Sequence, residues 1–168
     1  MPIAQTLLPE FDHEMAVTRR MLAVVPEADA DWRPHPKSTT LGDLAVHISR
    51  LASWGRSIFE VTELDLGAPA GGVSAKPRFS STRELLETFD RNVAQARAAL
   101  AAAPDADMEV TWTLRNGPAT VFSLPRTAVL RGFLLNHIIH HRGQLSVYLR
   151  LRDVPLPSVY GPTADVAR

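Results

Sequence analysis

The 168-residue sequence contains no cysteine. This absence excludes disulfide bonds, thiolate metal ligands and a cysteine nucleophile. Zinc ribbons and redox motifs are excluded for the same reason. Any thiol that takes part in a reaction of this protein must therefore arrive with the substrate.

An excess of charge of either sign is also missing, because 18 basic residues balance 18 acidic residues and the formal net charge is zero. The sequence has no basic tract, whereas domains that bind DNA or RNA usually carry a clear positive excess. We therefore expect no nucleic-acid partner.

Long apolar runs are absent as well, since no stretch approaches the roughly 18 consecutive apolar residues of a membrane-spanning helix. The first residues lack the basic region and apolar run of a signal peptide. We expect no membrane association and a cytoplasmic location.

The length and the ordinary apolar content predict a single domain over residues 1–168 with a substantial core.

Apolar residues recur every three or four positions in four long segments, which predicts four amphipathic helices. We place them at about residues 3–24, 40–58, 81–103 and 123–152. Capping-box patterns precede two of them, Thr40 with Asp43 and Ser81 with Glu84. For the last helix, Ser123 is the expected cap and Pro125 lies in the expected first turn. The proline-containing segment 31–38 is expected to be irregular and the segment 67–72 to be a flexible connection.

Two short runs with loosely alternating apolar residues, 108–114 and 119–122, flank Asn116 and Gly117. Asn-Gly between such runs is a strong indication of a β-hairpin. The predicted fold class is therefore all-α, a four-helix bundle with a short hairpin between its third and fourth helices. Metal sites in such bundles are built from side chains of facing helices.

Two histidines four residues apart, His137 and His141, lie within the apolar pattern of the last helix. Residues at i and i+4 lie one above the other on a helix face, so two imidazoles there can bind one metal ion. Buried imidazoles need partners, because an unpaired buried polar group costs about 1–3 kcal/mol. The alternative for each histidine is a hydrogen bond within the core.

A third histidine, His47, lies on the apolar stripe of the predicted second helix, where it can face the same point. Taken alone, a histidine in such a stripe is most often a hydrogen-bonded core residue. Together with His137 and His141 it completes a three-histidine set. Three protein ligands without a fourth are typical of a catalytic metal, which keeps a position open for water or substrate.

For other polar residues near these histidines, the sequence gives weaker evidence of a role at the metal site. Gln144 is three residues beyond His141 and can hydrogen-bond a ligand imidazole, which would fix its tautomer. Asp43 lies one turn before His47, although its role as an acidic residue at a helix start is a sufficient explanation. His140 competes with His141 because i and i+3 can also share a metal, but it lies farther from the centre of the apolar face.

Over nearly its whole length the sequence resembles the DinB/YfiT-like family of metal-binding four-helix-bundle proteins. The most specific part is residues 135–145, which include Asn136, the two histidines, Gly143 and Gln144. Residues 32–34 leading into 41–47, and the tail at 157–165, also resemble the family.

The resemblance implies that His47, His137 and His141 hold a divalent ion, commonly zinc or nickel, and that the bundle forms a homodimer. Several relatives are transferases or isomerases that use low-molecular-weight thiols such as bacillithiol or mycothiol. We therefore expect a metal-dependent enzyme that acts on a small molecule, with a metal-bound thiol or water as the reactive group rather than an identified catalytic side chain. The alternative is a non-catalytic metal-binding module of a stress response.

Overall fold

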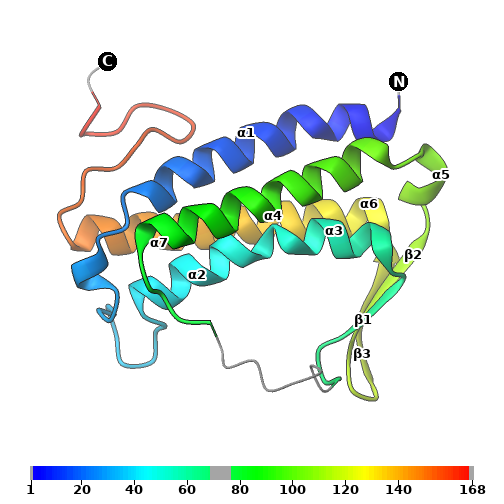
Figure 1. Cartoon of the computed structure of the whole chain (residues 1–168), viewed down its shortest axis with the longest axis horizontal. Helices are drawn as coiled ribbons and strands as arrows, with labels where there is room; N and C mark the ends of the chain where they lie inside the picture. The colour runs from blue at the N-terminus through cyan, green and yellow to red at the C-terminus, as the bar shows by residue number, and fades with distance from the viewer. Residues whose placement is uncertain (1, 69–76, 167–168) are drawn as a thin grey trace.

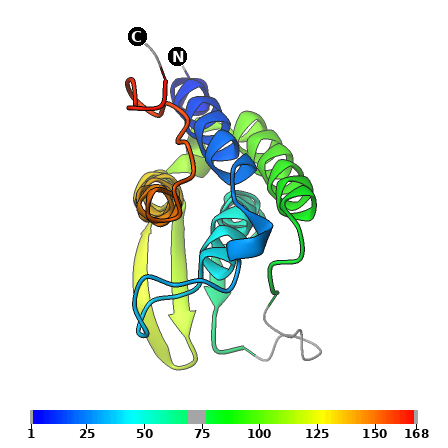
Figure 2. The ribbon, with the colours of Figure 1, turned by 90° about the vertical axis from the view of Figure 1, so that its left-hand side faces the viewer.

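The computed structural model describes residues 2–68 and 77–166, in which four columns of helix surround the hydrophobic core (Figures 1 and 2). The elements are α1 (Ile3–Ala23), η1 (Glu27–Asp29), α2 (Leu41–Leu51), α3 (Ser53–Glu60), β1 (Glu63–Asp65), α4 (Thr82–Ala102), α5 (Asp105–Met108), β2 (Thr111–Asn116), β3 (Ala119–Pro125), α6 (Arg126–Ala128), η2 (Val129–Leu135) and α7 (Asn136–Leu151). The predicted helical bundle with a small β element is confirmed. The expected connection at 67–72 lies mostly outside the described residues.

The predicted caps form at the starts of two helices. The Oγ of Ser81 accepts a hydrogen bond from the Glu84 N–H at 3.1 Å, and the Oγ1 of Thr40 accepts one from the Asp43 N–H at 3.1 Å. These bonds satisfy N–H groups that a helix start leaves unpaired. They fix where α4 and α2 begin, and α2 is the helix that carries His47.

The second helix of the prediction is interrupted at Ala52, and α2 and α3 follow one another with only this residue between them. The hydroxyl of Ser49 donates to the Val46 carbonyl and that of Ser53 donates to the Arg50 carbonyl, both at 2.8 Å. Serine hydroxyls that bond to the preceding turn compete with the helical hydrogen bonds and bend helices. Beyond the interruption, Gly55 lies so close to α4 that an added Cβ would stand 2.6 Å from the Ala96 Cβ.

The small sheet contains the predicted hairpin and one strand that was not predicted. The strand order is β1-β2-β3, with β2 and β3 antiparallel and β1 parallel to β2. The two-residue hairpin loop contains Gly117, whose φ of 58° favours glycine. Asp65 joins β1 to this loop, since its Oδ1 accepts hydrogen bonds from the N–H groups of Gly117 at 2.7 Å and Gly67 at 2.8 Å. These bonds hold the pKa of Asp65 below its usual value.

The last helix begins later than predicted, because β3 continues through Pro125, which pairs with Thr111. The expectation that Ser123 caps this helix is therefore wrong: Ser123 is a strand residue opposite Thr113. A π-helical segment, η2, then precedes the regular helix α7. Figure 1 shows α6, η2 and α7 as one long column behind α4.

The buried side of α7 consists of Ile138, Arg142, Leu145 and Leu149. Arg142 is the unexpected member of this stripe, because its side chain is only 3% exposed. Its Nη1 lies 2.7 Å from Glu14 Oε2, and the Glu14 side chain is only 7% exposed. The hydroxyl of Tyr160 accepts from Arg142 Nη2 at 2.6 Å and lies 3.0 Å from both carboxylate oxygens of Glu14. This group joins α7, α1 and the C-terminal tail.

No helix within the described part of the chain is both long enough and apolar enough to cross a membrane.

Replacement of Glu14 by Ala should lower the free energy of unfolding by about 3–5 kcal/mol, because it leaves the guanidinium of Arg142 buried without its carboxylate. Urea denaturation followed by circular dichroism measures this loss. The matched control is Glu10→Ala, which removes the partly exposed pair with Arg131 and should cost no more than about 1 kcal/mol. The double variant Glu14→Ala/Arg142→Met should recover part of the loss, and equal losses for Glu14→Ala and Glu10→Ala would contradict the buried-pair account.

Candidate metal centre

Three histidine side chains from two helices come together on one side of the bundle. His47 extends from α2, while His137 and His141 lie one turn apart on α7. Each offers a ring nitrogen, and these three atoms lie within 4.8 Å of one another. The ring centroids of His47 lie 5.3 Å from His137 and 4.6 Å from His141. The structure thus brings together the three residues that the sequence singled out.

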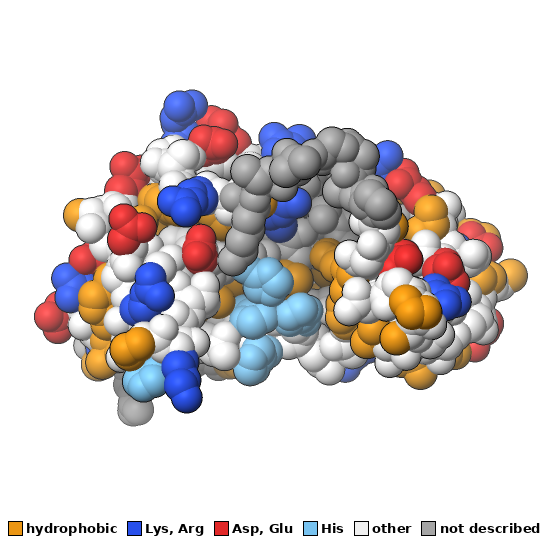
Figure 3. Space-filling view, turned by 90° about the horizontal axis from the view of Figure 1, so that it is seen from below, with side chains coloured by type: hydrophobic (Ala, Val, Ile, Leu, Met, Phe, Trp, Pro, Cys, Tyr) orange, Lys and Arg blue, Asp and Glu red, His pale blue; other side chains and the backbone are white. Residues whose placement is uncertain are grey.

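The group lies at the surface rather than deep in the core. His47 is exposed, and His137 and His141 are half-buried. Figure 3 shows histidine side chains gathered at the middle of this face of the molecule. The position of His47 corrects the expectation of a buried stripe residue, because Leu44, Ile48 and Leu51 form the buried stripe of α2 and His47 lies at its edge.

The ring of His141 is oriented by Gln144 on the next turn of α7. The Nδ1 of His141 lies 2.7 Å from the Oε1 of Gln144. With the amide oxygen as acceptor, Nδ1 carries the proton, which leaves the lone pair of Nε2 available for a ligand. This is the hydrogen bond expected from the spacing of the two residues, and partners of this kind orient metal-binding imidazoles.

His137 occupies a less polar environment. Burial lowers the pKa of His137, and positive charge on the neighbouring His141 lowers it further. The carbonyl of Phe133 acts in the opposite direction, but the buried Nδ1 of His137 has no hydrogen bond of acceptable geometry within the described residues. The imidazole is therefore neutral at pH 7, which is the protonation state that binds metal ions.

The donor set fits a divalent metal ion such as zinc or nickel. Neutral imidazoles are suitable ligands for both ions, and three imidazoles converge here. In residues 2–68 and 77–166 no carboxylate or fourth histidine joins the group. An ion held by these three nitrogens would keep coordination positions open, as catalytic sites do.

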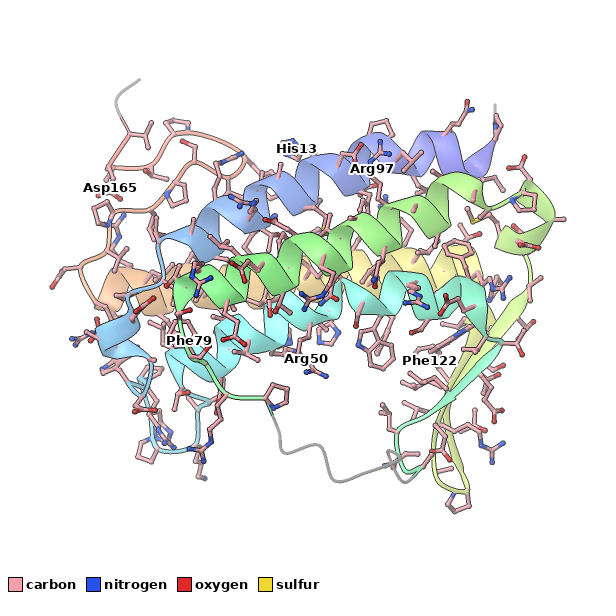
Figure 4. The ribbon with its side chains drawn as sticks, viewed as in Figure 1. His13, Arg50, Phe79, Arg97, Phe122 and Asp165 are labelled. Atoms are coloured by element: carbon pink, nitrogen blue, oxygen red, sulfur yellow. The ribbon has the colours of Figure 1, made fainter. Side chains whose placement is uncertain are left out.

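A cleft of about 230 Å³ adjoins His47 along α2 and α3. Its lining includes Asp43, His47, Arg50 and Trp54, whose spacings of four, three and four residues place them on one helix face. Figure 4 shows the labelled Arg50 extending from α2 away from the core. Asp43 thus lines the same cleft as His47, and its backbone N–H donates the hydrogen bond to Thr40 Oγ1 at the helix start.

Aromatic rings continue the wall of the site toward the hairpin. The ring of Phe133 lies 5.5 Å from His137 and 4.8 Å from Trp54, measured between centroids. Phe122 of β3 follows at 5.1 Å from Phe133, and it is labelled on the hairpin in Figure 4. Phe133, Trp54 and Phe122 are only partly buried, so they present an apolar surface beside the histidines.

The remaining histidines stay outside the group. His140 is exposed on α7, and its ring lies 4.9 Å from that of His141 without joining the three converging nitrogens. His13 stacks on Tyr160 at 6.3 Å, far along α1, and His35 accepts a hydrogen bond from the Lys37 N–H in its own loop. The preference for His141 over His140 agrees with this arrangement.

Comparison with known proteins identifies the family. A sequence model described as the DinB superfamily matches residues 10–145. The chain belongs to the DinB superfamily. Among solved structures, a DinB-like protein of Bacillus cereus superposes with a TM-score of 0.68 at 23% identity, over 95% of this chain and 98% of that one. A DinB-like protein of Bacillus subtilis gives 0.67 at 16% identity, over 92% and 96%.

These two structural superpositions show that this DinB chain shares the fold of the Bacillus proteins. No curated protein matches the chain. Arg50 and Phe133 were not predicted as site residues. The spacing of Arg50 from His47 was the available signal, because i and i+3 lie on the same helix face.

In metal-free protein, the imidazole of His141 should carry its proton on Nδ1, because the Oε1 of Gln144 accepts a hydrogen bond from it. Two-bond ¹⁵N–¹H correlation spectra of the imidazole at pH 8 distinguish the two tautomers. Gln144→Ala should produce a mixture, whereas Gln95→Ala, a change at an exposed position of α4, should leave the ring unaffected. A wild-type ring protonated mainly on Nε2 would contradict the assignment.

Proposed function

We propose that this DinB protein is a divalent-metal-dependent enzyme acting on a small molecule, with His47, His137 and His141 as the metal ligands. The observation that carries the proposal is the convergence of three ring nitrogens within 4.8 Å at the surface. Zinc or nickel is the ion that we expect, from the imidazole donors and from the family.

The surroundings of the histidines favour a catalytic over a structural role. The core of the bundle is largely aliphatic and is complete without an ion, unlike the core of a zinc finger. The histidines lie beside a cleft, where a substrate can approach from solvent. A structural ion would instead be expected to be enclosed by four protein ligands.

A divalent ion in this position would supply Lewis-acid activation, because it lowers the pKa of a water or thiol that it coordinates. The protein itself has no thiol, so a reacting thiol would be a low-molecular-weight substrate. The side chain of Gln144 holds the His141 ring in place, and the rings of Trp54 and Phe133 offer an apolar surface on which an electrophile can lie. Such positioning of two reactants increases the rate by proximity.

Thiol transfer or isomerisation is the reaction class that we favour, with hydrolysis by activated water as the second enzymatic option. The rival function is a non-catalytic metal-binding module, and the activity test below separates them. The homodimer and the cytoplasmic location remain predictions, of which the first is checked by light scattering at micromolar concentration.

Purified wild-type protein should bind one zinc or nickel ion per chain, and His137→Ala should weaken this binding by roughly 100-fold or more, beyond the loss typical of an outer hydrogen-bond partner. Competition with a chromophoric chelator measures the affinity. His140→Ala is the matched control, since this exposed histidine of the same helix lies outside the group. The circular dichroism of His137→Ala should remain helical, and a loss of helix would show that the ion is structural.

The metal-loaded protein should accelerate the attack of a low-molecular-weight thiol on a model electrophile, and His141→Ala should reduce the rate to that of the uncatalysed reaction. Initial-rate assays with a panel of thiols, electrophiles and esters measure the acceleration. The rate should rise with pH through the pKa of the bound thiol or water, because the deprotonated form is the nucleophile. Equal, slow rates for wild type and His141→Ala across the panel would leave the binding module as the function.

A further inference from the structure

Two clefts meet on the outer side of α2. The first is the cleft beside His47, and the second, of about 200 Å³, extends from it toward the start of α4. Val46, Arg50 and Pro77 line both of them. Arg50 therefore stands at the junction between the histidine site and the second cleft.

The second cleft is strongly basic. Its lining contains three guanidinium groups, those of Arg50, Arg78 and Arg91, and a single carboxylate, Glu84. That carboxylate accepts a hydrogen bond from the Ser80 hydroxyl, also in the lining. Figure 3 shows basic side chains close to the histidine group on this face. The chain as a whole has no net charge, so the lining of this cleft is more positive than the average of the protein.

The arginines of this cleft lack the carboxylate partners that most arginines of the described residues have. Ten arginines elsewhere in the described residues form ion pairs with carboxylates. Arg50, Arg78 and Arg91 form none with any described carboxylate, and Arg91 has only a 3.3 Å hydrogen bond to the Thr88 hydroxyl. The sequence of residues 69–76 contains no Asp or Glu that could supply a partner.

We propose that this arginine-lined cleft binds the anionic end of the substrate, a carboxylate or phosphate group, while the other end of the same molecule reaches the three histidines. Guanidinium groups match both anions with paired, charge-assisted hydrogen bonds. The inference rests on the proposed function only for the reacting end of the substrate. The anion site itself depends on the arginines alone.

The spacing along α2 fixes the orientation and the size of such a substrate. Arg50 is three residues beyond His47, a rise of about 4.5 Å along the helix. Asp43 lies on the other side of His47 in the same cleft and repels an anion. The substrate therefore points its acidic group from the histidines toward Arg50 and α4, about one helical turn from the reacting end.

Mercaptosuccinate, a four-carbon thiol with two carboxylates, and its dimethyl ester form a matched pair of probes. Cobalt-loaded protein is titrated with each while the thiolate-to-cobalt absorption band is followed. The diacid should bind roughly tenfold more tightly than the ester, the effect of a charge-assisted hydrogen bond. Esterification also makes the thiol more acidic, which favours the ester, so tighter binding of the diacid cannot originate at the thiol. A carboxylate can also chelate the cobalt ion, and the comparison with Arg50→Gln separates that contribution from the contribution of the arginine.

Arg50→Gln should remove the preference for the diacid while leaving the affinity for the ester and the cobalt content unchanged. Arg56→Gln, at an arginine of α3 that lines neither cleft and pairs with Glu60, should change neither affinity. Equal binding of diacid and ester by the wild type, an unchanged preference for the diacid in Arg50→Gln, or an equal loss of both affinities in Arg50→Gln would each overturn the proposal.

A metal-free measurement separates this proposal from the proposed function. Succinate and glycerol 2-phosphate are added to ¹⁵N-labelled apoprotein, and the Nε–Hε resonance of Arg50 is followed. A saturable shift supports the anion site, and the anion with the lower dissociation constant identifies carboxylate or phosphate as its group. No shift with either anion overturns it. A shift without any thiolate–cobalt band in the loaded protein would retain the anion site and reject the thiol chemistry.

Discussion

The buried ion pair between Arg142 and Glu14 sets the rotation of α7 within the bundle. A buried charge is strongly destabilising without its partner, so the face of α7 that carries Arg142 must pack against α1, which carries Glu14. Each residue of a helix turns by about 100°, which places His137 and His141 on the side of α7 that faces α2. The tail adds Tyr160 to the same group. A hydrogen-bonded charge deep in the bundle thus determines where three imidazoles meet at its surface.

Much of this arrangement was predictable from the sequence, because it depends on local periodicity. The spacing of His137 and His141 predicted two rings on one helix face, and the apolar stripe of the second helix indicated that His47 faces them, although His47 lies at the edge of that stripe. The capping patterns that begin at Thr40 and Ser81 correctly predicted where two helices start. Gly117 fixed the position of the hairpin through its backbone freedom. The ligand role of the histidines remains a prediction.

Features that depend on contacts distant in sequence were not predictable. β1 has only three residues and exists because it pairs with β2 and because Asp65 binds the hairpin loop. The burial of Arg142 could not be predicted, since nothing near it in sequence reveals a carboxylate 128 positions away. The acidic group of Glu14 is likewise indistinguishable from a solvated one until α1 and α7 are packed.

The π-helical segment η2 has a consequence for how this protein can change. A π segment amounts to one residue inserted into an α-helix, and such insertions are frequent beside functional sites. Here it separates the buried Arg126, which donates to the carbonyls of Phe59 and Val61, from the buried Arg142. Deletion of one residue between 129 and 135 would restore a regular helix and turn its two anchored ends by about 100° relative to each other. The segment therefore sets the rotation of one end of this helical column relative to the other. The number of residues in this stretch is constrained more strictly than their identity.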